Sequence, residues 1–215
     1  MAAAPPGPGG RDASGARRAS PSVARNRDGI RDAFARMAIR EGRVLEIASG
    51  TGEHGVHITA GYPGLVWQPS DPDAEARASI TAWAEAAQGR VLAPLALDVM
   101  RPRWWEGLGP IDAVCCINMI HIAPWEAALG LFDGASALLE AGGRVFLYGP
   151  FRRNGEHTAP SNAAFDASLK ARNPLWGVRD LEGDLIPAAE ARGFRLADRL
   201  AMPANNVSVV FERAG

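Results

Sequence analysis

Residues 44 to 55, Val-Leu-Glu-Ile-Ala-Ser-Gly-Thr-Gly-Glu-His-Gly, form the stretch that decides the fold. The apolar residues among the first four are typical of a buried strand. Gly50 and Gly52 then allow the backbone to approach a ligand where a Cβ would collide. Glu53 begins a helix whose first amides point toward the turn. A strand, a glycine turn and a helix in this order hold a nucleotide cofactor, so we expect one to lie over this turn.

The composition of the chain fits one globular α/β domain. The chain has 215 residues, of which 47% are hydrophobic, which suits a sheet buried on both faces. Residues 1–21 are rich in Ala, Pro, Gly, Ser and Arg and contain no uninterrupted apolar run. We therefore expect a disordered tail rather than a secretory signal. A single domain over residues 22–215 is expected to follow, without a second full domain.

Charge and cysteine content indicate which partners and which cellular compartment to expect. The formal net charge is -1, so the overall balance gives no reason to expect a nucleic-acid partner. No stretch approaches the roughly 18 apolar residues that a membrane-spanning helix needs. Cys115 and Cys116 are adjacent within an apolar run, which suits core packing in a reducing compartment. We expect a cytoplasmic protein with a small-molecule substrate, and nothing in the sequence indicates its oligomeric state.

Short apolar runs alternate with helical patterns along the chain. Each apolar run ends in a polar or turn residue, as the strands of a parallel sheet do. The last two runs are joined by a short connection without a crossover helix, so the final strand should run antiparallel. We predict strands at residues 44–47, 65–67, 94–97, 113–117, 144–148, 194–196 and 207–211, and helices at 28–39, after 53, and at 73–88, 161–171 and 180–192.

Polar residues follow the predicted parallel strands. The carboxyl ends of such strands meet at one edge of the sheet, and ligands of open α/β sheets bind in the crevice there. The segment from Glu46 to Gly52 should therefore converge with Asp71, Asp98, Asn118 and Tyr148.

A nicotinamide dinucleotide is one candidate for this crevice. The run Gly50-Thr-Gly52-Glu-His-Gly55 satisfies the dinucleotide fingerprint, and Asp71 lies near the spacing of a ribose-binding acid. One common class of nicotinamide enzyme of this size uses a Tyr-x-x-x-Lys pair. Neither Tyr62 nor Tyr148 is followed by Lys at that spacing, so an NAD-dependent oxidoreductase is the weaker alternative.

S-adenosylmethionine accounts for more of the polar residues. Glu46 can hold the methionyl ammonium through water, and the turn from Gly50 to Gly52 can pass the sugar. Asp71 can accept hydrogen bonds from both ribose hydroxyls, and Asp98 can accept one from the adenine amino group. The alternative is that each aspartate only caps the turn after its strand. Their joint placement favours the cofactor.

A metal site is the less favoured interpretation of the histidines near the turn. Glu53, His54 and His57 do not form the His-Glu-x-x-His order of zinc enzymes, and no further cluster of ligands accompanies them. We therefore predict no metal.

Several longer segments carry a resemblance to a known family. They are Trp67-Gln-Pro-Ser-Asp71, Ile117-Asn-Met-Ile-His-Ile122, Leu147-Tyr-Gly-Pro-Phe151 and Met202-Pro-Ala-Asn-Asn206, with Ser161–Asp166 and Asn173–Asp180. From about Ser22 onward the chain resembles the domain-of-unknown-function 938 family, which includes methyltransferase-like protein 26. The resemblance implies an α/β, Rossmann-like class I methyltransferase fold with a seven-stranded, mostly parallel sheet, an antiparallel last strand and helices on both faces. It implies S-adenosyl-L-methionine as cofactor and names no substrate.

The glycine turn departs from the wider methyltransferase superfamily at one position. Ala48 stands where many members carry glycine, and alanine is small enough that we expect binding to persist. The cofactor-binding residues that we predict are Arg25, Asn26, Glu46, Ala48, Gly50, Gly52, Asp71, Asp98, Val99 and Asn118.

Two residues are candidates for proton transfer. Methyl transfer from a sulfonium is an in-line displacement, so it needs few catalytic side chains. If a proton must leave, His121 is our first candidate base, because its ordinary pKa of about 6.5 suits proton transfer near neutrality. Tyr148 is the second candidate. The alternative for His121 is that it orders the Asn118 loop through hydrogen bonds.

The wall of the acceptor site is expected after the fifth predicted strand. Arg152 and Arg179 would clamp a carboxylate or phosphate while Trp176 covers an apolar part, which suggests a small, anionic acceptor. The alternative is that these arginines pair with nearby acids, such as Asp180 and Glu182. The substrate-binding residues that we predict are Arg152, Asn162, Trp176, Arg179, Asn205 and Asn206.

Three functions follow from these residues. We predict an S-adenosylmethionine-dependent methyltransferase that acts on a small acceptor. The alternatives are a protein that binds this cofactor without catalysis and acts through a partner, and an NAD-dependent oxidoreductase.

Overall fold

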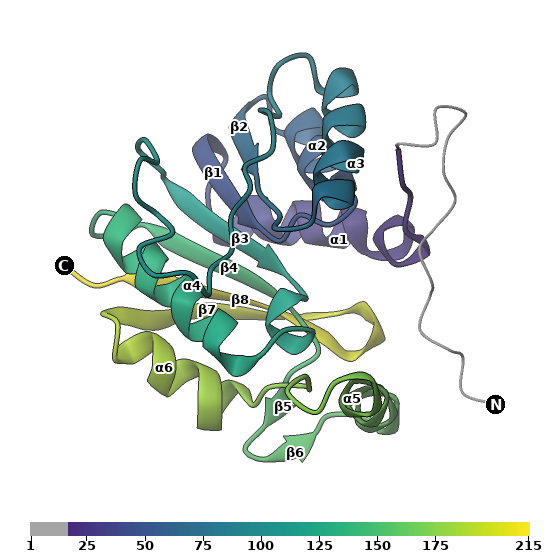
Figure 1. The fold of residues 1–215 in the computed structure, drawn as a ribbon. Coiled ribbons are helices and arrows are strands. Elements are labelled where there is room, and N and C mark those ends of the chain that lie inside the picture. The colour runs from purple at the N-terminus through teal and green to yellow at the C-terminus, as the bar shows by residue number, and fades with distance from the viewer. Residues whose placement is uncertain (1–16) are drawn as a thin grey trace.

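Six strands in the order β2-β1-β3-β4-β8-β7 form the central sheet of the computed structural model, which describes residues 17–215 (Figure 1). The first four strands in this order run parallel, and β8 runs antiparallel to both of its neighbours. The expected mixed sheet with an antiparallel last strand is thereby confirmed. The strands are β1 (Glu41–Ile47), β2 (Gly64–Pro69), β3 (Ala113–Ile117), β4 (Arg144–Gly149), β7 (Phe194–Met202) and β8 (Asn206–Arg213).

The sheet has six strands rather than the seven that we predicted, because residues 94–97 do not form a regular strand. The segment from Val91 to Leu95 follows the edge of β2 through two isolated parallel bridges, Trp67 to Val91 and Ser70 to Leu95. Between these bridges lies Pro94, which has no N–H to donate to a ladder. The pairing is therefore interrupted where a continuous seventh strand was expected.

Helices cover both faces of the sheet (Figure 1). On one face, Ile30, Phe34 and Ile58 pack with Trp67 and other residues of the strands. On the other face, α4 and the short α6 pack over a second apolar cluster. The helices are α1 (Pro21–Met37), α2 (Glu53–Gly61), α3 (Ala74–Ala84), α4 (Trp125–Leu138), α5 (Pro160–Arg172) and α6 (Ile186–Glu190), with short turns η1 (Glu85–Ala87), η2 (Met119–His121), η3 (Leu181–Leu185, a π-helical turn) and η4 (Pro203–Asn205).

Helix α1 begins seven residues earlier than we predicted. Pro21 stands in its first turn, where a missing N–H costs nothing, and Ser20 occupies the N-cap position. Residues 17–20, which we expected in the tail, hydrogen bond to neighbouring elements. The Arg18 N–H donates to Ser79 Oγ at 2.9 Å, and the Ser20 N–H donates to Glu53 Oε2 at 2.8 Å. The rest of the expected tail, residues 1–16, lies outside the described part of the chain.

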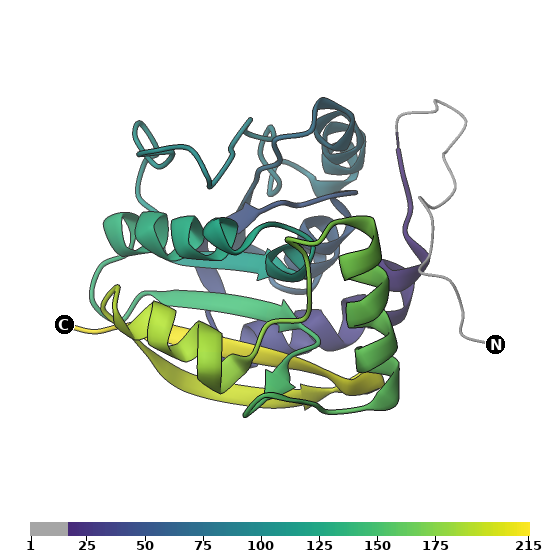
Figure 2. The ribbon, with the colours of Figure 1, turned by 60° about the horizontal axis from the view of Figure 1, so that its bottom comes forward.

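Helix α5 and a two-stranded hairpin lie beyond the carboxyl end of the parallel strands (Figure 2). The hairpin consists of β5 (Arg152–Arg153) and β6 (Glu156–His157). Asn162 of α5 donates a hydrogen bond to the carbonyl of Asn205, so the helix is joined to the loop between β7 and β8. No helix within residues 17–215 combines the length and the apolar character needed to cross a membrane.

Candidate functional site

The strand order brings the predicted polar residues to one edge of the sheet. Strands β2, β1, β3 and β4 are neighbours and parallel, so the segments that follow them lie side by side. The turn after β1 has left-handed backbone angles at Ala48 (φ 56°), Gly50 (φ 60°) and Gly52 (φ 89°). A Cβ on Gly52 would come within 2.8 Å of the Ile80 backbone, so glycine is required where α2 meets α3.

Hydrogen bonds between two serines hold this turn against the end of β2. The Ser49 N–H donates to the Ser70 carbonyl at 2.8 Å, and the Ser70 N–H donates to Ser49 Oγ at 3.1 Å. The Ser70 hydroxyl donates to the Glu46 carbonyl at 2.6 Å. The turn is therefore fixed by the protein itself, as a preorganised binding site requires.

Glu46 lies behind the turn and is 1% exposed. Trp67 Nε1 donates a hydrogen bond to its Oε2 at 2.9 Å. Burial raises the pKa of Glu46 to about 7, more than the hydrogen bonds from Trp67 and Ser49 lower it. A cationic group near the turn would favour the charged carboxylate, so the position is compatible with an ammonium held through water.

Asp71 lies beside the glycine turn, as we predicted. Its Oδ2 accepts a hydrogen bond from the Gly50 N–H at 3.0 Å, and its Oδ1 accepts one from the Asp73 N–H at 2.9 Å. Asp71 therefore caps a turn, which was the alternative to a ribose contact. A carboxylate offers about four lone-pair sites, so roughly two stay open for hydroxyl donors. The two interpretations are compatible at this residue.

A cavity of about 100 Å³ lies next to the turn, with Asp98 and Val99 in its wall. Asp98 Oδ1 accepts a hydrogen bond from the Met100 N–H at 3.0 Å, so this aspartate also caps a turn. The rest of the wall is largely apolar, which suits a flat ring with one polar edge. The cavity is lined by Ile47, Ala48, Pro72, Leu97, Asp98, Val99, Met100, Met119, Ala123 and Ala127.

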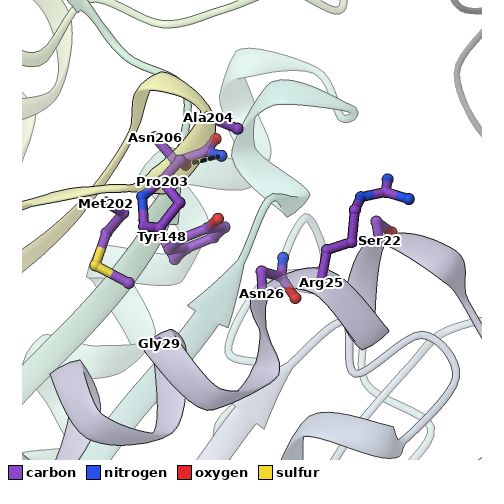
Figure 3. Close-up of a pocket in the computed structure, with 9 residues that line it drawn as sticks. All are labelled: Ser22, Arg25, Asn26, Gly29, Tyr148, Met202, Pro203, Ala204 and Asn206. Carbon is purple, nitrogen blue, oxygen red and sulfur yellow. Dashed lines mark hydrogen bonds between the residues drawn. The ribbon is translucent and has the colours of Figure 1, made fainter.

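Two larger cavities of about 480 and 560 Å³ lie on the other side of Asn118 and share part of their walls. The first is bounded by α1 and the hairpin between β7 and β8 (Figure 3). The second extends to α5 and includes three of the predicted acceptor residues, Asn162, Asn205 and Asn206. The shared wall consists of Ser22, Asn26, Tyr148, Ala204 and Asn206.

Tyr148 and Asn26 are polar residues of the shared wall. Tyr148 is 3% exposed, and burial raises its pKa above the ordinary value, although a hydrogen bond with the Asn26 side chain lowers it in part. Asn26 Oδ1 lies 3.1 Å from His54 Nε2. Burial lowers the pKa of His54 to about 4, so the ring is neutral at neutral pH. Because an amide oxygen can only accept, Nε2 carries the proton of this ring and donates to Asn26.

His121, our first candidate base, is fully buried and is not part of the wall of these cavities. Its Nδ1 accepts a hydrogen bond from the Arg179 N–H at 3.3 Å, and its carbonyl accepts one from the Gly177 N–H at 2.9 Å. Burial, and then the charge of Arg179, lower its pKa to about 3. A ring this weakly basic does not accept protons at neutral pH. This geometry favours the alternative, in which His121 orders the segment around Asn118.

Backbone carbonyls accept hydrogen bonds from both guanidinium groups of the predicted clamp, and neither Arg152 nor Arg179 lines the two larger cavities. Arg179 donates to the carbonyls of Ile120, Ala123 and Leu175. Arg152 donates to the Val178 carbonyl and lies 3.6 Å from Asp184. Trp176 packs near Arg172, outside the walls of the two larger cavities. The sequence alone does not distinguish an arginine that binds backbone carbonyls from one that faces a ligand.

Several wall residues escaped the sequence analysis. On α1, Ser22 and Gly29 were not predicted, and they line one cavity at helical spacing with Asn26, which was predicted as a cofactor contact. This pattern was present in the sequence, but the helix was predicted to begin only at residue 28. Arg172 of α5 also lines the second cavity.

Within residues 17–215, no three His, Cys, Asp or Glu side chains gather in a way that would hold a metal ion.

Comparison with solved structures supports the fold. An O-methyltransferase family protein from Burkholderia thailandensis is 17% identical with a TM-score of 0.75, over 90% of this chain and 57% of that chain. Human N-acetylserotonin methyltransferase, solved with SAM, is 11% identical with a TM-score of 0.75, over 90% and 53%. CalO1, a methyltransferase in calicheamicin biosynthesis solved in the SAH-bound form, is 20% identical with a TM-score of 0.70, over 86% and 54%.

These similarities establish a Rossmann-like class I methyltransferase fold, although the chain spans only a little over half the length of these structures. A family model described as "Protein of unknown function (DUF938)" matches residues 17–213. Because the match covers nearly all of the described chain, the protein belongs to this family.

Proposed function

We propose that the protein is an S-adenosylmethionine-dependent methyltransferase that acts on a small-molecule acceptor. The observation that carries the proposal is the small cavity walled by Ala48, Asp98 and Val99, directly beside the fixed glycine turn and Asp71. A small, mostly apolar space with one carboxylate suits adenine, and open lone pairs on Asp71 suit a ribose. The solved methyltransferases with SAM or SAH share this fold, which supports the same choice of cofactor.

The residues present suit each part of this cofactor. Glu46 and the glycine turn would hold the methionyl part, Asp71 the ribose, and Asp98 with Val99 the adenine. When bound, S-adenosylmethionine supplies a methyl group on a sulfonium sulfur that a nucleophile can displace. Asn118 lines the second of the two larger cavities, so an acceptor in that cavity would approach from the side of Tyr148 and Asn162.

The larger cavities support an enzyme rather than a protein that only binds the cofactor. Together they offer room for a small molecule, and their walls combine apolar surface with several amide groups. The chain's part in catalysis would be to hold the acceptor in line and to exclude water. Tyr148 stays protonated at neutral pH, because burial raises its pKa, so it would act as a hydrogen-bond donor.

Calorimetric titration with S-adenosylhomocysteine and, in parallel, with NAD tests the choice of cofactor. We expect S-adenosylhomocysteine to bind and NAD to bind much more weakly. Binding of NAD alone would indicate an oxidoreductase.

For a protein that binds S-adenosylhomocysteine, Asn118→Ala then separates the remaining alternatives. Loss of methyl transfer with retained binding supports an enzyme, whereas a protein that only binds the cofactor shows no transfer in either form.

A further inference from the structure

We propose that the methyl acceptor carries an anionic group, which is bound by the buried hydroxyl of Tyr148 and by the exposed guanidinium of Arg25. This inference deepens the proposed function and rests on it. Both residues line the same cavity, Arg25 from α1 and Tyr148 from the end of β4 (Figure 3).

The charge of the cavity walls is the first argument. None of the described residues that line the two larger cavities is acidic, whereas Arg25 and Arg172 are both cationic. The chain as a whole has 24 acidic and 23 basic residues, so the walls do not simply reflect composition. A cationic acceptor would meet two arginines and no carboxylate here, and an anionic acceptor would meet complementary charge.

The bonding of the arginines is the second argument. The guanidinium of Arg25 is exposed and forms no ion pair or hydrogen bond with any residue in the described part of the chain. Arg172 has the ring of Trp176 beside it, at 5.4 Å. In contrast, Arg179 is bound to three carbonyls and Arg153 to Glu182. The two arginines at the cavities therefore have donors that are available to a ligand.

The direction of the Tyr148 hydroxyl is the third argument. His54 Nε2 donates to Asn26 Oδ1, so the Asn26 amide must present its NH₂ group to other partners. Asn26 also forms a hydrogen bond with Tyr148, and because its oxygen is taken by His54, its NH₂ group donates to the phenol oxygen. The phenol proton is then available to point into the cavity. A buried donor of this kind binds an anionic oxygen more strongly than a neutral one.

The remaining surface suits an apolar body attached to the anionic group. Met202 and Pro203 line the first cavity. Phe165 and Ile122 line the second, where Ile122 is 42% exposed. A small ring with a carboxylate therefore matches both the apolar and the cationic parts of the walls.

The probes are benzoate and benzamide, which have the same shape and differ in charge. Each is titrated calorimetrically into the full-length protein saturated with S-adenosylhomocysteine. We expect benzoate to bind more tightly than benzamide. Tyr148→Phe should weaken benzoate binding about tenfold or more, because it removes a buried hydrogen bond to a charged group. Arg25→Gln should weaken it by up to about fivefold, because the pair is exposed to solvent. Neither variant should change benzamide binding by a comparable factor.

Arg36→Gln is the matched control, because Arg36 is exposed on the same helix and does not line a cavity. We expect it to leave benzoate binding unchanged. Equal binding of the two probes, binding of neither, or an equal loss in Arg25→Gln and Arg36→Gln would overturn the proposal. S-adenosylhomocysteine affinity, measured for every variant, monitors folding. If the native protein fails to bind S-adenosylhomocysteine, the proposed function fails, whereas the charge preference is still measured on the protein alone.

Discussion

Glu46 is a carboxylic acid that the fold keeps partly protonated at neutral pH. Its ordinary pKa of 4.5 is raised to about 7, chiefly by burial. Because the folded pKa is higher than the unfolded one, the folded state binds more protons between these values. The stabilisation is therefore fully present below about pH 4.5 and is lost as the pH rises through 7.

Replacing Glu46 with glutamine should remove this pH dependence. The glutamine carbonyl can still accept the hydrogen bond from Trp67 Nε1. From pH 5 to 8, we expect the native protein to lose up to about 3 kcal/mol of unfolding free energy relative to Glu46→Gln. Urea unfolding of both proteins at several pH values measures the difference. If the free energy of unfolding changed with pH in the same way for both proteins, Glu46 would not be held protonated.

Ala48 carries a left-handed backbone that alanine adopts only at a cost. Its φ is 56°, and this conformation costs an L-residue roughly 1–2 kcal/mol. Ala48→Gly removes this cost, but part of the gained stability is offset, because glycine loses more conformational freedom on folding. We expect Ala48→Gly to raise the free energy of unfolding by up to about 1 kcal/mol. A lower stability in urea unfolding would contradict this account of the turn.

Single residues were predictable where strand order alone decides their position. Asp71 and Asn118 follow β2 and β3, the two parallel strands that flank β1, and Asp98 follows the interrupted segment beside β2. The structure places all three around the glycine turn and the cavities beside it. Arg179 was not predictable, because its partners are backbone carbonyls from η2, from the loop before α4 and from the loop after α5. His54 was considered only as a metal ligand, although its partner is Asn26, 28 residues away in the sequence.

At the scale of elements, α4 positions the loop that forms the wall of the small cavity. Trp104 is 7% exposed, and its Nε1 donates to the Gly130 carbonyl at 2.8 Å. A Cβ on Gly134 would lie 2.0 Å from the Trp104 ring, so the loop can dock only because this helix position has no side chain. The same loop begins with Asp98 and Val99.

We expect Gly134→Ala to displace this loop. Overpacking of a well-packed contact typically costs about 1–3 kcal/mol, and the shifted loop should also weaken S-adenosylhomocysteine binding. Thermal unfolding and calorimetry measure the two effects. Ser136→Ala, a small change on the same helix, is the control and should alter neither. If Gly134→Ala kept native stability and affinity, the loop would not depend on this contact.

Most element types were predictable, and the errors have physical causes. The strands with strong apolar runs were found, whereas residues 94–97 form only an isolated bridge because Pro94 interrupts the pairing. The start of α1 was misplaced because its first turns carry Ser22, Arg25 and Asn26, which lack an apolar period. These polar residues face a cavity instead of the core, so the apolar period of a helix is missing there.

At the scale of the whole molecule, the candidate acceptor site is formed by two elements that are far apart in the sequence. One face of α1 forms the wall of the first cavity together with residues 202–206 of the β7–β8 hairpin (Figure 3). The sequence predicts the fold class through its strand order. It does not predict this contact, because the meeting of α1 with the hairpin depends on how both pack against β4.

The central claim is that Asp71 belongs to an S-adenosylmethionine site, and one measurement tests it most directly. S-adenosylhomocysteine is titrated into the native protein, Asp71→Ala and Asp73→Ala. Asp73 is the control because it caps α3 through the Glu75 N–H, two residues away. We predict that Asp71→Ala weakens binding at least tenfold, since charged hydrogen bonds are each worth about 1.5–3 kcal/mol, and that Asp73→Ala binds like the native protein. Equal affinity of all three proteins, or no binding to the native protein, would contradict the account.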